Sequence, residues 1–216
     1  MPLFALFLAS AALAIATSTG LVDAPWLYWL CKPLTTGLVI AHAVGRGHGQ
    51  PALRRAVLAG LGLSLVGDVA LMFPQGFLAG LVSFLLAHLA YLVAFTRGGV
   101  RLAARPGPFI AYALLAALIL AVLWPGVPAG LRVPVVAYVL CLAAMAAQAA
   151  VRWQVLRGGV DAAGAQHAAL GGVLFLCSDA LLAFNRFHTP LPASALWVLA
   201  TYWAAQWLIA SALARR

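Results

Sequence analysis

The chain alternates between long apolar stretches and short breaks that contain glycine, proline or arginine. Each stretch is close to the roughly 20 residues that an α-helix needs to cross the hydrocarbon core of a bilayer. The breaks, such as Gly-Arg-Gly-His-Gly-Gln-Pro at 45–51 and Pro-Gln-Gly at 74–76, cannot continue a helix. The pattern therefore predicts eight transmembrane helices, at approximately 2–20, 26–44, 53–73, 77–96, 107–124, 132–152, 164–184 and 193–213.

The composition supports a membrane protein and excludes several other classes. Of the 216 residues, 65% are hydrophobic and 8% are charged, whereas a soluble domain has roughly 25% charged residues. So few charged side chains cannot cover the surface of a soluble fold of this length, and the apolar majority is expected to face lipid. A cytosolic enzyme, a disulfide-rich secreted protein and a disordered chain are excluded. Because the connections are short, we expect 1–216 to form one integral membrane domain.

The net charge of +9 comes from arginines at the ends of the apolar stretches, which argues against nucleic-acid binding. Ten of the 13 basic residues follow the second, fourth, sixth and eighth stretches, and two lie on the other side. The ten are Arg46, Arg54, Arg55, Arg97, Arg101, Arg105, Arg152, Arg157, Arg215 and Arg216, and the two are Arg132 and Arg186. This bias predicts a multi-pass protein of the inner or plasma membrane with both termini in the cytoplasm.

The third and seventh stretches share a pattern at an offset of 111 residues, from position 68 to position 179. Each carries an aspartate, Asp68 or Asp179, followed five residues later by a phenylalanine. The same offset relates Tyr91 to Tyr202. Because the two stretches run in the same direction, we expect an all-α polytopic fold built from two parallel four-helix repeats.

Three ionisable residues lie inside the predicted membrane helices: Lys32, Asp68 and Asp179. A charged side chain there costs roughly 2.5–3.5 kcal/mol on insertion scales, so each one marks a candidate functional site. At the helical rise per residue, all three lie about 8–9 Å below the outer ends of their helices. We therefore expect them to share one polar cavity, in which two carboxylates can supply an acid and a base. A structural ion pair between helices is the alternative.

The fourth stretch places Gly80, Phe84, His88 and Tyr91 on one helical face. This face is expected either to line the cavity below the charged residues or to pack in the core. The histidines and cysteines do not share one depth or a metal-ligand spacing, so we expect neither a metal nor a cofactor.

The segment after the seventh stretch carries Asn185 and Arg186, which we expect in an outer loop. Arg186 would either bind an anionic head group at the mouth of the cavity or anchor the end of the helix. Ser178 precedes Asp179 and is expected to bond to its own helix or to a neighbouring one.

Taken in order, these residues resemble the YhhN family, which includes the animal transmembrane lysoplasmalogenases. The resemblance covers nearly the whole chain and rests on the ordered set, because no single motif is specific. The set comprises Lys32-Pro33-Leu34, Gly67-Asp68 with Leu71-Met72, Gly80, Phe84, His88 and Tyr91, and Ser178-Asp179 with Asn185. The resemblance implies a hydrolase that cleaves the vinyl ether bond of a lysoplasmalogen or a related lyso-lipid into a fatty aldehyde and a glycerophospho head group.

The chemistry of enol ethers agrees with this implication. Hydrolysis begins with proton transfer to the β-carbon and gives an oxocarbenium ion that water captures, so it needs one acid and one anionic group. We expect Asp68 and Asp179 to be catalytic. The expected substrate-binding residues are Lys32, His88, Tyr91, Ser178, Asn185 and Arg186.

The partners implied are a lysophospholipid substrate and the bilayer. Two other function classes stay open at the sequence level. A transporter of an amphipathic small molecule or lipid would suit a parallel repeat with charges at its boundary. A scaffold without a ligand would use the charged residues for stability alone.

Overall fold

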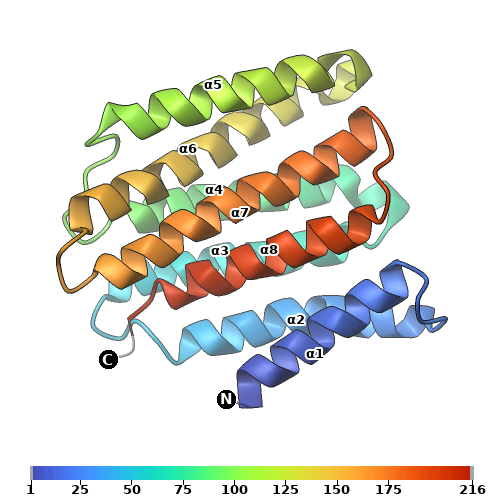
Figure 1. The fold of residues 1–216 in the computed structure, drawn as a ribbon, viewed down its shortest axis with the longest axis horizontal. Helices are drawn as coiled ribbons and strands as arrows, with labels where there is room; N and C mark the ends of the chain where they lie inside the picture. The colour runs from blue at the N-terminus through green and yellow to red at the C-terminus, as the bar shows by residue number, and fades with distance from the viewer. Residues whose placement is uncertain (1, 215–216) are drawn as a thin grey trace.

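The computed structural model describes residues 2–214, and within them eight α-helices lie side by side in one bundle (Figure 1). The helices are α1 (Pro2–Ser18), α2 (Pro25–Val44), α3 (Pro51–Ala70), α4 (Phe77–Phe95), α5 (Pro106–Leu123), α6 (Arg132–Leu156), α7 (Ala162–Phe187) and α8 (Ser194–Ser211). Short 3-10 turns at Pro74–Gly76, Trp124–Gly126 and Ala129–Leu131 complete two of the connections. For the described residues, the predicted all-α fold with eight helices is confirmed.

Three helix ends differ from the prediction by three residues or more. Helix α3 ends at Ala70, because the chain turns through the next residues into Pro74, which opens a 3-10 turn. Helix α7 continues to Phe187, so Asn185 and Arg186 lie in its last turn and not in an outer loop as predicted. Nothing in that segment breaks a helix before the next proline. Helix α6 likewise continues to Leu156, four residues beyond the predicted end at 152.

Within residues 2–214, four segments are long and apolar enough to cross a membrane: Pro74–Phe95, Pro106–Gly126, Ala129–Leu156 and Ala162–Phe187. They contain α4, α5, α6 and α7. Helix α1 is also apolar but shorter, at 17 residues.

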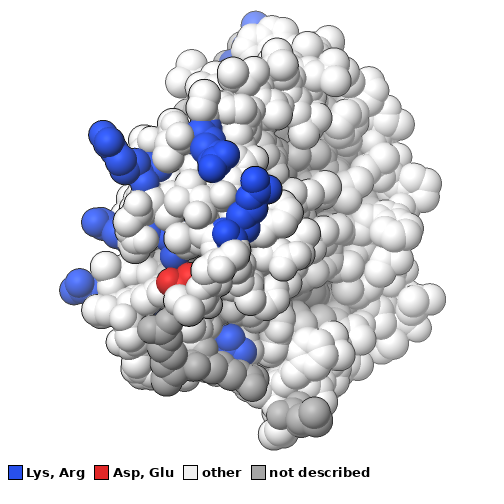
Figure 2. All heavy atoms as spheres, turned by 60° about the vertical axis from the view of Figure 1, so that its left-hand side comes forward, with Lys and Arg blue, Asp and Glu red and all other residues white. Residues whose placement is uncertain are grey.

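The connections gather at two ends of the bundle. The α2–α3, α4–α5 and α6–α7 connections lie at the end where α1 begins and α8 ends (Figure 1), and we call this the basic end. Figure 2 turns it toward the viewer and shows that Lys and Arg side chains gather there. The other four connections form the opposite end, which we call the pocket end.

The two halves of the chain pack in the same way. Helix α3 packs most extensively on α4, as α7 does on α8, and α1 packs on α2 as α5 does on α6. The halves meet where α4 packs on α6 and α8 packs on α2. Close approach of α3 and α4 depends on Gly60, because a Cβ atom there would lie 2.3 Å from the Tyr91 ring.

Candidate functional site

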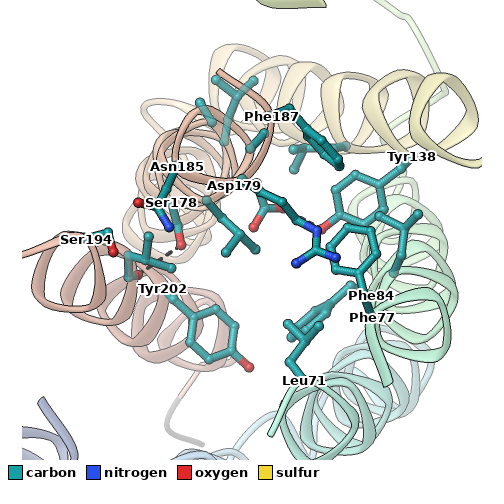
Figure 3. A pocket seen from close by; sticks show the side chains of 18 of the residues that line it. Leu71, Phe77, Phe84, Tyr138, Ser178, Asp179, Asn185, Phe187, Ser194 and Tyr202 are labelled. Carbon is teal, nitrogen blue, oxygen red and sulfur yellow. Dashed lines mark hydrogen bonds between the residues drawn. The ribbon is translucent and has the colours of Figure 1, made fainter. Parts of the chain in front are cut away.

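A cavity of about 600 Å³ opens at the pocket end of the bundle, with walls from every helix except α1 (Figure 3). Most of its lining is apolar. The polar lining residues are Tyr28, Lys32, Asp68, Tyr138, Ser178, Asp179, Asn185, Arg186, Ser194 and Tyr202. The structure thus brings the three charged residues found within apolar stretches, Lys32, Asp68 and Asp179, to one cavity.

Asp179 reaches the cavity from α7 and is held by side chains of α4 and α6. Its Oδ2 atom accepts a 2.5 Å hydrogen bond from the Tyr138 hydroxyl and lies 3.4 Å from Nε2 of His88. The Tyr138 hydroxyl also lies 3.0 Å from that nitrogen. Because the Tyr138 hydroxyl uses its hydrogen in the bond to Asp179, its oxygen accepts the hydrogen bond from Nε2–H of His88. Among residues 2–214, no hydrogen bond reaches Oδ1 of Asp179.

Asp68 reaches the cavity from α3 and is held by side chains of α2 and α8. Its Oδ2 atom accepts hydrogen bonds from Thr36 at 2.6 Å and from Tyr202 at 2.7 Å. Trp203 donates to the Thr36 hydroxyl, and Gln206 donates to the Tyr202 hydroxyl. In the described part of the chain, Oδ1 of Asp68 receives no hydrogen bond either.

The two carboxylates are therefore arranged alike. A tyrosine hydroxyl binds Oδ2 of each one, Tyr202 for Asp68 and Tyr138 for Asp179. In each, Oδ1 is left for a bound molecule. Because a buried carboxylate needs hydrogen-bond donors, the hydroxyl groups stabilise both side chains in these positions. Both carboxyl groups thus line one cavity, an arrangement that suits acid and base catalysis on a molecule bound there.

Lys32 lies on the α2 wall of the cavity, and 5% of the residue is exposed. Its Nζ atom is 5.6 Å from the centre of the Tyr28 ring. The described residues show no ion pair between Lys32 and a carboxylate within 4.0 Å. The ammonium therefore adds positive charge to the cavity without the direct pairing that a structural ion pair requires.

His88 and Tyr91 lie beneath the cavity and do not line it. Both are fully buried, against an aromatic cluster that includes Phe175. His88 contacts Asp179 directly as well as through Tyr138, whereas the Tyr91 hydroxyl donates to Oε1 of Gln206 at 2.7 Å. His88 therefore helps to hold Asp179 itself, whereas Tyr91 is linked to Asp68 only through Gln206 and Tyr202.

The remaining predicted site residues lie around α7. Ser178 donates to a carbonyl of α8 at 3.0 Å, and Asn185 accepts a 2.9 Å hydrogen bond from the backbone of Leu191. Both line the cavity while holding α7 to α8 and to the connection between them. Arg186 is exposed at the cavity, with its guanidinium carbon 3.8 Å from the centre of the Phe77 ring.

Sequence reasoning missed the residues that hold the two carboxylates: Thr36, Tyr138, Tyr202 and Gln206. One signal was present, since Tyr138 lies six residues into its predicted helix, about 9 Å from the outer end and close to the depth estimated for Lys32. Within residues 2–214, no three His, Cys, Asp or Glu side chains come together as a candidate metal site.

Comparison with known proteins agrees with the resemblance seen in the sequence. The YhhN family matches residues 27–213 of the chain. Lysoplasmalogenase TMEM86B of Sus scrofa is 36% identical over 181 residues, which cover 83% of this chain and 71% of the relative. Lysoplasmalogenase TMEM86A of Homo sapiens is 34% identical over 179 residues, 80% of this chain and 70% of the relative.

A bacterial relative is similar over the same part of the chain. Lysoplasmalogenase of Mycobacterium bovis is 29% identical over 188 residues, 82% of this chain and 64% of the relative. No solved structure matches the chain.

Proposed function

Because the chain belongs to the YhhN family, we propose that it hydrolyses the vinyl ether bond of a lysoplasmalogen or a related lyso-lipid. The products are a fatty aldehyde and a glycerophospho head group. The observation that carries the proposal is the pair of carboxylates, Asp68 and Asp179, on the walls of one largely apolar cavity. Each has a free oxygen and a hydroxyl group that fixes the other oxygen.

The proposed setting is a membrane that all eight helices cross, with both termini in the cytoplasm. The four segments with the length and composition of a membrane span support it, and the remaining helices lie alongside them (Figure 1). The gathering of arginines at the basic end supports the orientation, because cytoplasmic loops carry the excess of Lys and Arg. The cavity then lies in the outer half of the bilayer, where a lyso-lipid can reach it.

The proposed reaction uses both carboxyl groups in turn. The protonated one transfers its proton to the β-carbon of the vinyl ether, and the electrons of the double bond form the new C–H bond. The resulting oxocarbenium ion is stabilised by the anionic carboxylate, which also removes a proton as water bonds to the α-carbon.

The hemiacetal then collapses with a second exchange of protons. Its hydroxyl group returns a proton to the first carboxylate, while the second carboxyl protonates the departing glycerol oxygen. The C–O bond breaks, the aldehyde leaves, and both carboxyl groups regain their starting protonation. Since each aspartate gives and takes one proton per cycle, neither can be replaced by an amide.

The other site residues have supporting parts in this proposal. Arg186 lies seven residues after Asp179, about 10.5 Å along the same face of α7, so it is suited to bind the phosphate while Asp179 faces the ether bond. Lys32 keeps the second carboxylate ionised or contacts that phosphate. His88 positions Asp179, Tyr91 positions the Tyr202 hydroxyl through Gln206, and Ser178 and Asn185 shape the wall beside the head group.

The test is aldehyde release from a lysoplasmalogen by the purified protein, followed by mass spectrometry of all lipids. Asp68→Asn and Asp179→Asn are each expected to lower turnover by about 10²–10⁴-fold, the usual contribution of a general acid or base. A variant with near wild-type turnover would remove its residue from the mechanism. No aldehyde from the wild-type protein, with flux of uncleaved lipid into sealed vesicles, would favour the transporter instead.

A further inference from the structure

The cavity has a polar part and an apolar part. Apart from Tyr138, its polar side chains come from α2, α3, α7 and α8. The part facing α4, α5 and α6 is apolar, and we call it the apolar lobe. Its residues are Leu81, Ala116, Ile119, Leu123, Val135 and Val139.

Room for the lobe arises from the way α5 packs. By the 111-residue offset, α5 is the counterpart of α1, and α4 is the counterpart of α8. Helix α1 packs on both α2 and α8, whereas α5 packs on α6, makes minor contacts with α7 and has hardly any with α4. The pair α5 and α4 therefore lacks the packing that α1 and α8 have. The apolar lobe lies between α4 and α5, in the space that this leaves.

The side chains of α5 show which of its faces meets the lobe. Ala116 and Leu123 are 6% and 1% exposed and line the cavity, while Leu114 and Leu118 on other faces are 67% and 64% exposed. Ala116 lies seven residues before Leu123, so this lining extends about 10.5 Å along the helix. Helix α5 therefore forms an elongated apolar wall inside the bundle.

The order of groups along α7 relates the lobe to the carboxylates. Asp179, Ala183 and Arg186 occur at spacings of four and three residues and line the cavity from one face of the helix. In a single-chain vinyl ether lipid, the reacting carbons are the first two of the hydrocarbon chain. With the phosphate at Arg186 and the chain in the apolar lobe, those carbons lie at the boundary, beside Asp179.

We infer that the apolar lobe binds the hydrocarbon chain of a single-chain ether lipid, and that the α5 wall sets which chain lengths are accepted. This inference takes the identity of the lipid from the proposed function. Binding of the hydrocarbon chain in the lobe, however, does not require that the lipid be cleaved. Apolar burial of the chain provides binding free energy in proportion to the apolar area that is removed from water.

The first test fills the lobe from α5. Ala116→Trp is expected to lower kcat/KM for a long-chain lysoplasmalogen about tenfold and to leave a short-chain one largely unchanged, because a tryptophan removes space that only the long chain uses. Ala117→Trp is the matched control, since the neighbouring residue is exposed on the outside of α5 and should behave as wild type. Equal loss for both chain lengths, or full activity of a folded Ala116→Trp protein, would overturn the assignment.

The second test measures binding without cleavage. The wild-type protein in nanodiscs is photolabelled with a 1-O-alkyl lysophospholipid that carries a diazirine on its chain and has no vinyl ether bond. We expect labelled peptides from α5 and α6 at the lobe, with labelling lost on addition of unlabelled lysolipid. Uncompeted labelling confined to lipid-facing positions such as Leu114 and Leu118 would refute the chain site. Competed labelling of the lobe, together with no aldehyde release when the same protein is given a lysoplasmalogen, would instead overturn the proposed function alone.

Discussion

The two carboxylates of the cavity are each held at one oxygen by hydroxyl groups from other helices. Asp68 depends on Thr36 and Tyr202, and Asp179 depends on Tyr138, with His88 behind it. A carboxylate this deep in an apolar bundle would be costly without these donors. Fixing one oxygen leaves the other in a defined position toward the cavity, which is what proton transfer to a carbon atom requires.

These residues differ in how far the sequence alone could predict them. Asp68 and Asp179 stand out because an ionisable group within an apolar stretch needs a functional or structural reason. Tyr138 and Tyr202 do not stand out, since tyrosine is common in membrane helices near the interface. Their importance depends on a partner that lies on a different helix, and a single sequence does not give that pairing.

The side chain of Arg186 allows a prediction about substrate binding. We expect Arg186→Gln to raise KM for a lysoplasmalogen about tenfold or more while kcat changes little, because the guanidinium binds the phosphate and takes no part in proton transfer. Steady-state kinetics over a range of substrate concentrations measures both constants.

Arg132→Gln is the matched control for that measurement. Arg132 also lies at the pocket end with its guanidinium carbon 5.0 Å from the centre of an aromatic ring, that of Trp124, but it does not line the cavity. The Arg132→Gln variant should therefore have the same KM as the wild-type protein. An equal rise in KM for both variants would show that Arg186 acts only through the overall positive charge of this end.

The helices themselves were predictable in number and extent, because their breaks contain proline and glycine and their interiors do not depend on tertiary contacts. Which side of each helix faces the interior of the bundle was not predictable. A helix that is apolar on most sides lacks the polar stripe that orients a helix in a soluble protein. Thus His88 and Tyr91 share a face with Phe84 as predicted, but they lie deeper and pack beneath the cavity.

The pairing of α3 with α4 gives a prediction for stability. Gly60→Ala is expected to lower the free energy of unfolding by about 1–3 kcal/mol, because the new methyl group meets the buried ring of Tyr91, whose hydroxyl is held by Gln206. Thermal unfolding in detergent, followed by circular dichroism, measures the change in Tm.

Gly62→Ala tests whether the effect belongs to the contact or to the loss of a glycine. Gly62 lies in the same helix, and a Cβ atom there would meet nothing within 4 Å. Since alanine favours a helix by about 0.8–1.0 kcal/mol over glycine, this variant should be at least as stable as wild type. A similar decrease in Tm for both variants would contradict the close approach of the two helices.

The whole molecule has a clear polarity, because most of the described arginines lie at the basic end (Figure 2) and the cavity opens at the pocket end. This polarity could be inferred from the sequence, since the basic residues follow every second apolar stretch. A polar cavity shared by Lys32, Asp68 and Asp179 could also be expected from their depths, but its apolar lobe could not, because the lobe depends on α5 packing hardly at all on α4. In the proposed orientation, this arrangement would open the proposed reaction site toward the outer leaflet.

The orientation in the membrane is testable in intact cells. We replace the three cysteines by serine and introduce either Thr189→Cys, in the α7–α8 connection, or Gly159→Cys, in the α6–α7 connection. With the basic end in the cytoplasm, a membrane-impermeant maleimide should label only the first variant until the cells are lysed. Labelling of Gly159→Cys alone in intact cells would reverse the topology.

The central claim is that a carboxyl group protonates the β-carbon of a vinyl ether, and solvent deuterium tests it most directly. The purified protein cleaves a lysoplasmalogen in D₂O, and mass spectrometry determines where deuterium is bound in the aldehyde. We predict a single deuterium on the carbon next to the aldehyde carbon, and far slower formation of this product with Asp68→Asn or Asp179→Asn. Aldehyde without that deuterium, or unchanged rates in both variants, would contradict the mechanism.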